Sequence, residues 1–143
     1  MAMVTIHSQF LSIPYDGKRH PQAVTFDPSK GANCQLFAYA VLKHFGITVP
    51  PFRSSELWED EEYTVKVEQL EPLDLLLFNP TSDSWGAHVA VYLGDTQLIH
   101  LSKAIGVPAI TSLEELQRIP RFLTLVGAKR VKPLRDSPNV QKV

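Results

Sequence analysis

An internal disulfide bond is excluded, because the 143 residues contain a single cysteine, Cys34. The sequence also lacks an excess of charge: 14 basic and 15 acidic residues give a formal net charge of -1. It contains no basic stripe of the kind that binds nucleic acid and no polybasic cluster of the kind that binds anionic membranes. We therefore expect neither nucleic acid nor a membrane among the partners.

Long apolar runs are missing as well. The run at residues 75–78 is one of the longest, and it is far too short to span a membrane. The first ten residues have neither the charged start nor the apolar stretch of a signal peptide. As written, the sequence predicts a cytoplasmic protein, with export by another route or a trimmed leader left open.

The length predicts one domain, residues 1–143. Turn-forming residues are frequent in the first thirty positions, which predicts a segment that wraps around the core. The core is expected over residues 14–131, followed by a polar tail at 132–143 that is frayed. The oligomeric state is not indicated.

Helical patterns occur in three places. Apolar residues recur at three- and four-residue steps from Cys34 to Phe45, with Asn33 suited to the N-cap and Gly46 to the C-terminal end. Ser54 or Ser55 is expected to cap a short helix over residues 56–58. A capping-box pattern at residues 111–115 predicts a helix that runs to about residue 119.

Strand patterns fill most of the second half. They predict strands at residues 65–67, 73–78, 88–93, 97–101 and 122–131. The 88–93 run is almost continuously apolar, which predicts burial on both faces. Gly94 and Asp95 predict a tight hairpin turn. A helix followed by antiparallel strands indicates the α+β class.

Cys34 is the first candidate for chemistry, since it stands where a loop becomes a helix. Unpaired amides in the first turn of a helix stabilise a thiolate and so lower the pKa of the thiol. The alternative is an inert buried side chain, because free cysteine is among the most buried residue types.

His88 and His100 flank the predicted hairpin. The expected pairing sets His100 opposite about residue 89, so the two imidazoles are neighbours and one orients the other. A structural histidine pair is the alternative. With Cys34 they would resemble a zinc set, but no short ligand pair supports one, so neither metal nor cofactor is expected. His7, His20 and His44 are expected to be without a role.

Several segments together resemble the NlpC/P60 family of papain-like cysteine peptidases and amidases, best known for cutting cell-wall peptides. They lie at residues 31–39, 45–50, 70–78, 88–94 and 98–100, and the similarity extends over about residues 14–131. The resemblance implies an α+β fold in which an N-terminal helix carrying the cysteine packs on a central antiparallel β-sheet.

The resemblance also implies roles for single residues. Cys34 becomes the nucleophile, His88 the general base and acid, and His100 the residue that orients His88. The resemblance assigns substrate binding to Tyr15, Asn33, Ser54 and Ser55. The chain departs from the family pattern at five positions: Asn33 replaces an aspartate, Gln35 a serine, Leu36 and Leu73 each a glycine, and Ala87 a small polar residue. The segment from Tyr15 to Cys34 is also longer than in the family pattern and lacks its Gly-Gly pair.

These observations predict a cysteine hydrolase that cleaves an amide or peptide bond through a thioester. The expected substrate is a peptidoglycan stem peptide. Three alternatives stay open: an acyltransferase that passes the thioester to another acceptor, an amidase on a substrate outside the wall, and a non-catalytic binding module of the same fold.

Overall fold

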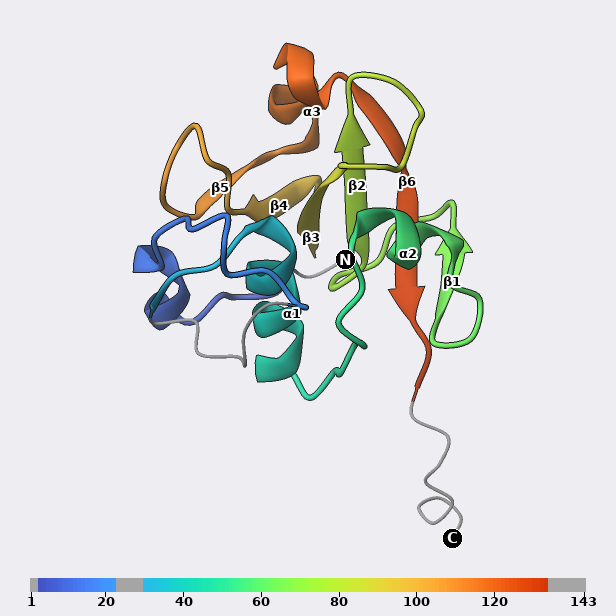
Figure 1. Cartoon of the computed structure of the whole chain (residues 1–143), viewed down its shortest axis with the longest axis horizontal. Helices are drawn as coiled ribbons and strands as arrows, with labels where there is room; N and C mark the ends of the chain where they lie inside the picture. Colours follow the sequence, from blue (N-terminus) through green and yellow to red (C-terminus); the bar gives the residue numbers. More distant parts are fainter. Residues whose placement is uncertain (1–2, 23–29, 134–143) are drawn as a thin grey trace, which may run out of the picture.

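A six-stranded antiparallel sheet organises the chain, in the strand order β1-β6-β2-β3-β4-β5 (Figure 1). The computed structural model describes residues 3–22 and 30–133. None of the helices in this part of the chain is both long and apolar enough to cross a membrane. The expected tail lies largely outside the described residues, as does part of the expected wrapping segment.

The strands are short and mostly coincide with the predicted ones. They are β1 (Thr64–Val67), β2 (Leu75–Asn79), β3 (His88–Gly94), β4 (Gln97–His100), β5 (Ala109–Ser112) and β6 (Thr124–Val131). All seven residues of β3 are buried, which confirms the expectation from its continuous apolar run. The helical segments are η1 (Ser8–Ser12), α1 (Cys34–His44), α2 (Ser54–Glu59), α3 (Leu113–Leu116) and η3 (Pro120–Phe122).

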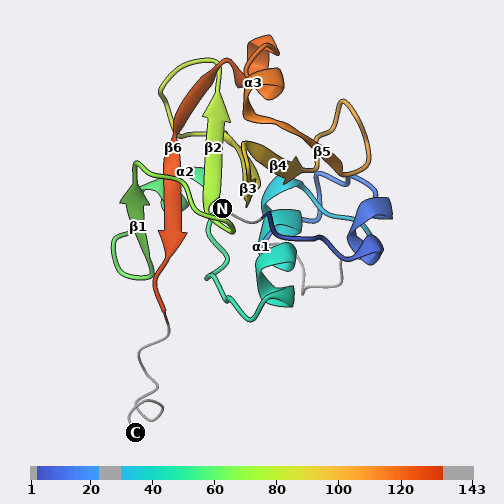
Figure 2. The same ribbon diagram turned by 180° about the vertical axis from the view of Figure 1, so that it is seen from behind.

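Helix α1 covers one face of the sheet near β3 and β4, as the views from both sides show (Figures 1 and 2). Residues 35–42 of this helix are all buried. They pack with alternate residues of β3, namely Val89, Val91 and Leu93. A helix buried over this much of its surface is stabilised mainly by apolar packing rather than by helix propensity.

The opposite face of the sheet has its own apolar cluster. Ala90 and Tyr92 of β3 pack there with residues of β2, β4 and β6 and with the segment that follows β5: Leu76, Phe78, Leu98, Leu116, Phe122 and Ala128. Because side chains alternate along a strand, β3 contributes side chains to the apolar clusters on both faces of the sheet.

The turn between β3 and β4 is shifted by one residue from the predicted one. Positive φ angles occur at Asp95 (51°) and Thr96 (61°), and Val91 pairs with Ile99. Continued along the strands, this register sets His100 opposite residue 90 rather than 89. His88 and His100 therefore project from the same face, because residues 88 and 90 do.

Three local predictions were wrong. Strand β5 was missed, since residues 109–112 show no clear alternation and half of them also belong to the capping box. That capping box is present at Ser112 and Glu115, but α3 ends at Leu116, within a single turn. Helix α2 begins after Arg53, whose N–H donates to Glu56 Oε1 at 2.8 Å, so neither Ser54 nor Ser55 is the cap.

Asp74 joins the start of β2 to β6. Its buried carboxylate accepts from Arg130 Nε at 2.8 Å and Nη2 at 2.9 Å, and from the Glu71 N–H at 2.8 Å. The preceding residue, Leu73, has φ 78°, a left-handed conformation that costs a branched side chain energy and suits glycine. The leucine thus occupies a glycine-like position, which agrees with the departure noted in the sequence.

Helix α2 is anchored to β6 through Trp58 and Lys129. The buried Lys129 ammonium donates to the Trp58 carbonyl at 3.2 Å and also to the carbonyl of Asp60. The indole of Trp58 lies against Gly127, where an added Cβ would meet Trp58 Cζ3 at 2.7 Å. These contacts set the position of α2 and of the residues at its start.

Replacing Gly127 by alanine should therefore destabilise the protein. The added methyl group forces Trp58 away from β6, and overpacking of this kind costs about 1–3 kcal/mol in the free energy of unfolding. Urea denaturation measures the difference. The matched control is Gly17→Ala, where a Cβ meets only the flexible end of Tyr15, at 3.4 Å. If Gly127→Ala costs as little as Gly17→Ala, the contact with Trp58 is not tight.

Candidate active site

Cys34 is the first residue of α1, as predicted, and is partly buried. Asn33 is the N-cap, and its Oδ1 accepts from the Leu36 N–H at 2.8 Å. The segment just before it is held by Tyr15, which forms a parallel bridge with Ala32. The thiol thus sits at a helix start whose geometry is set by a side-chain cap and by pairing with residues far away in sequence.

Burial outweighs the helix start in the electrostatics of the thiol. The pKa of Cys34 lies above its ordinary value of 9.0, with desolvation as the main cause. Backbone amides of Val89, Gln35 and Cys34 itself, together with the Arg53 guanidinium, act in the opposite direction but do not cancel it. The expectation of a lowered thiol pKa is therefore wrong.

The predicted histidine pair is present. His88 Nε2 lies 2.9 Å from His100 Nδ1, and the two rings are nearly perpendicular. His88 also stacks on Phe122, with ring centroids 4.4 Å apart. The ring of His88 is thus fixed on two sides, by a hydrogen bond and by an aromatic face.

Both imidazoles are neutral at physiological pH. Burial holds the pKa of His88 well below its ordinary value, and the nearby His100 and Arg121 lower it further. Burial also lowers the pKa of His100, to about 4. The site therefore contains a neutral thiol and two neutral imidazoles rather than a preformed ion pair.

The Cys34 thiol lies near the start of β3, the strand whose first residue is His88. The influence of the Val89 amide on the Cys34 thiol places the sulfur against the start of β3, directly after His88. Across residues 3–22 and 30–133, however, no hydrogen bond joins Cys34 to His88. Catalytic contacts of this kind are often loose before a substrate binds.

Tyr15 and Asn33 both lie near the thiol, but their polar groups differ in how they are used within the protein. Burial raises the pKa of the Tyr15 hydroxyl, and the nearby Cys34 raises it further, which puts the phenol close to the sulfur. Asn33 is buried, and its oxygen is occupied by the helix cap.

Ser54 and Ser55 line a cavity of about 320 Å³ that Gln35, the residue after Cys34, also lines. Its other lining residues are Arg53, Glu56, Trp85 and Gly86. Arg53 Nε donates to Gln35 Oε1 at 3.1 Å, which connects the residue after the nucleophile to the start of α2. This hydrogen bond therefore links Arg53, a lining residue of the cavity, to the residue adjacent to the candidate nucleophile.

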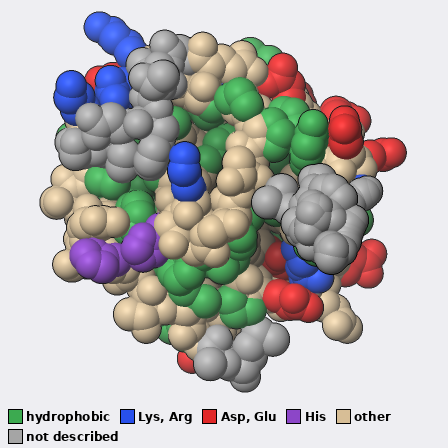
Figure 3. All heavy atoms as spheres, turned by 90° about the horizontal axis from the view of Figure 1, so that it is seen from below, with side chains coloured by type: hydrophobic (Ala, Val, Ile, Leu, Met, Phe, Trp, Pro, Cys, Tyr) green, Lys and Arg blue, Asp and Glu red, His purple; other side chains and the backbone are tan. Residues whose placement is uncertain are grey.

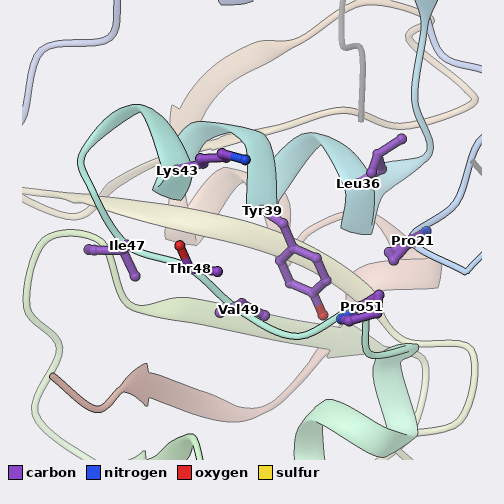
Figure 4. Close-up of a pocket in the computed structure, with 8 residues that line it drawn as sticks. All are labelled: Pro21, Leu36, Tyr39, Lys43, Ile47, Thr48, Val49 and Pro51. Carbon is purple, nitrogen blue, oxygen red and sulfur yellow. The ribbon is translucent and has the colours of Figure 1, made fainter. Parts of the chain in front are cut away.

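A second cavity, of about 190 Å³, lies along α1 (Figure 4). Tyr39 projects across it from the helix toward Pro51, and the Tyr39 hydroxyl donates to the Phe52 carbonyl at 3.0 Å. None of the candidate catalytic residues lines it.

Of the remaining histidines, His20 lies near Arg53, and burial together with this charge lowers the pKa of its imidazole. His7 and His44 are exposed, with ring centroids 5.8 Å apart. The face in Figure 3 has histidine side chains at one edge and acidic side chains gathered along the other. In the described part of the chain, no three His, Cys, Asp or Glu side chains come together as a metal-binding group.

Three contributors to the site were not singled out from the sequence. Phe122 stacks on His88 although 34 positions separate them, and no local pattern signals this contact. Arg53 directly precedes Ser54 and Ser55, which the resemblance assigned to the substrate side, but it was not itself assigned a role. Trp85 had a usable signal, because it is a lone tryptophan in a polar loop three residues before His88.

The fold and the site together define an α+β protein with a cysteine at the start of a helix and a histidine pair on the neighbouring strands. A family model described as "NlpC/P60 family" matches residues 15–122. The chain belongs to the NlpC/P60 family.

Curated and solved relatives agree with this assignment. The chain is 33% identical over 87 residues to the murein DD-endopeptidase MepS/murein LD-carboxypeptidase of Escherichia coli (strain K12), which covers 60% of this chain and 44% of that protein. The chain thus matches less than half the length of this relative.

Among solved structures, an NlpC/P60 family protein from Bacillus cereus ATCC 10987 is 28% identical, with a TM-score of 0.61 over 87% of this chain and 37% of that one. The NlpC/p60 domain of the peptidoglycan hydrolase SagA is 23% identical, with a TM-score of 0.54 over 87% of this chain and 91% of that one. The latter similarity concerns the fold.

The raised thiol pKa predicts slow alkylation of Cys34 near neutral pH. The thiolate is the reactive form, so the rate of iodoacetamide labelling should rise with pH and reach its midpoint above the ordinary value of 9.0. Mass spectrometry of the labelled protein from pH 5 to 11 measures this. A plateau reached by pH 6 would show instead a stabilised thiolate.

The buried histidines predict loss of stability in acid. The unfolded chain binds protons below pH 6.5, whereas folded His100 does so only near pH 4, so the free energy of unfolding falls as pH drops through this window. Each such histidine contributes a slope of at most about 1.4 kcal/mol per pH unit. His100→Asn should flatten the profile measured by urea denaturation, whereas exposed His44→Asn should not.

Proposed function

We propose that this chain is a cysteine hydrolase that cleaves an amide bond in peptidoglycan peptides, with Cys34 as nucleophile. The observation that supports it most is the 2.9 Å contact between His88 and His100 at the strand against which the Cys34 sulfur lies. A base held by a second polar group beside a nucleophile is the general arrangement of nucleophilic catalysis in hydrolases.

The histidine contact implies a tautomer. If His88 Nε2–H donates to His100 Nδ1, the lone pair at His88 Nδ1 is left to accept a proton from the thiol. His100 acts as a positioning residue in this scheme, since it orients the ring of His88 and does not touch the substrate.

The neutral site favours general-base catalysis over a preformed thiolate. His88 takes the proton of Cys34 as the sulfur attacks the substrate carbonyl, and then gives it to the leaving amine. The resulting thioester is hydrolysed by water that His88 activates. The amide of Cys34 and a neighbouring donor would stabilise the oxyanion.

The choice of substrate class is supported by a relative. The Escherichia coli protein that is 33% identical over 87 residues is a murein DD-endopeptidase and LD-carboxypeptidase by name. A peptide amide of the bacterial wall is therefore the first substrate to test.

Cys34→Ala should abolish turnover while leaving the melting temperature nearly unchanged, because it removes only one sulfur atom from a partly exposed position. The test is mass spectrometry of products after incubation with muropeptides and with a mixed peptide library. The wild-type protein should also show a mass increase on Cys34 when the thioester is trapped by acid quenching.

Two further variants complete this test. His88→Asn should lose activity to a similar degree, and His44→Asn should keep it. Full activity in purified Cys34→Ala protein would contradict the proposed mechanism. Binding of muropeptides by wild-type and Cys34→Ala protein alike, with no cleavage by either, would identify a binding module.

A further inference from the structure

Phe122 contacts both histidines of the candidate active site. Its ring stacks on that of His88, with centroids 4.4 Å apart and an angle of 25° between the planes. It also meets the ring of His100 in a T-shaped contact, with centroids 6.2 Å apart and an angle of 80°. One phenyl ring therefore lies against both partners of the 2.9 Å contact between His88 Nε2 and His100 Nδ1.

The three rings are buried together on one face of the sheet. His88 is 8% exposed, His100 1% and Phe122 6%. Because side chains alternate along a strand, His88 projects from the same face as Ala90 and Tyr92. The apolar cluster on that face contains Ala90, Tyr92 and Phe122. Phe122 is therefore the residue through which this cluster reaches the histidine pair.

The position of Phe122 is fixed from two sides. Phe122 is the last residue of η3, and Pro120 begins this segment with a backbone φ that its ring restricts. Two residues further on, Thr124 pairs with Asn79 at the end of β2, and its hydroxyl donates to the Pro80 carbonyl at 3.1 Å. Figure 1 shows the chain passing from α3 into β6 at this end of β2. The sheet itself thus holds the segment that carries the phenyl ring.

The hydrogen bond to His100 does not by itself fix the imidazole of His88. The torsion about the Cβ–Cγ bond of a histidine has a broad and roughly two-fold energy profile, so the ring plane can turn at little cost. The bond to His100 selects which edge of the ring faces that residue. The stacked contact with Phe122 adds the missing constraint, because it is kept only while the two rings remain nearly parallel.

Phe122 also controls what else the histidines can bond to. A phenyl ring has neither a donor nor an acceptor among its atoms, so it offers no competing partner to either imidazole. Water at the same place would compete for the ring nitrogens of both residues and reduce the net stabilisation from their mutual bond. A hydrogen bond that water does not reach is electrostatically stronger than the same bond in water.

We propose that Phe122 is a positioning residue of this site, whose ring sets the plane of the His88 imidazole and shields the bond between His88 and His100 from water. Phe122 acts through His88 and does not touch the substrate. The catalytic meaning of this proposal rests on the proposed hydrolase function. The effect of Phe122 on the histidine pair, however, can be measured without turnover.

The test follows the proton between His88 Nε2 and His100 Nδ1 by NMR in protein labelled with ¹⁵N-histidine. Scalar coupling between the two nitrogens across the hydrogen bond assigns its signal. In the wild-type protein at neutral pH this signal should be resolved, because the buried proton exchanges slowly with water. In Phe122→Leu the exchange should be about 2- to 10-fold faster, the range that loss of one aromatic contact implies. Phe122→Met, which fills the volume without a flat face, should show the same increase.

Phe10→Leu is the matched control. Phe10 is also buried, at 4% exposed, but it lies in the cluster that contains α1 and meets the ring of His44 at 5.3 Å. This variant should lose a similar free energy of unfolding in urea and leave the exchange unchanged. An unprotected proton in the wild-type protein, or unchanged exchange in both Phe122 variants, would overturn the proposal. An equal increase in Phe10→Leu would also overturn it, since it would show a general loosening of the fold.

A kinetic measurement separates this proposal from the proposed function. On a peptide that the wild-type protein cleaves, Phe122→Leu should lower kcat about 10- to 100-fold, as small misplacement of a catalytic group does. KM should stay nearly unchanged, because the ring does not touch the substrate. Faster proton exchange in the Phe122 variants without cleavage by the wild-type protein supports the role of the ring and contradicts the hydrolase function. Cleavage with an unchanged kcat in Phe122→Leu overturns the positioning role.

Discussion

The packing of α1 against β3 is the constraint on which the rest of the structure depends. It buries the apolar face of the helix and one face of the strand, and it brings Cys34 at the start of the helix against the start of the strand. His88 begins that same strand, so one packing contact carries both residues to the same end of the sheet. The register between β3 and β4 then adds His100 to the same face as His88.

Burial of these three side chains also determines the direction in which their pKa values shift. A thiol at a helix start in water would have a lowered pKa, but desolvation raises that of Cys34, and it lowers those of His88 and His100. All three groups are thereby kept neutral. This arrangement favours proton transfer during attack on a substrate over a standing ion pair.

Much of the fold follows from patterns visible in the sequence. The 3.6-residue spacing after Asn33, the continuous apolar run of β3 and the turn residues after it are local signals, and the structure has the elements they predict. Strand β5 and the short α3 were predicted poorly because their limits depend on neighbouring strands rather than on local pattern. The contact of Phe122 with His88 and that of Arg53 with Gln35 join segments far apart in sequence, so no local signal could reveal them.

The sequence by itself determined the residue types available for chemistry and the helix, strand and turn that present them, because capping, periodicity and turn conformation are local properties. It also contained enough family pattern to identify NlpC/P60, which the match over residues 15–122 confirmed. Only the tertiary structure decided the charge states of the site and the cavity that Gln35 forms with the start of α2. Both arise from desolvation and from pairing between distant segments, which depend on how the whole chain packs.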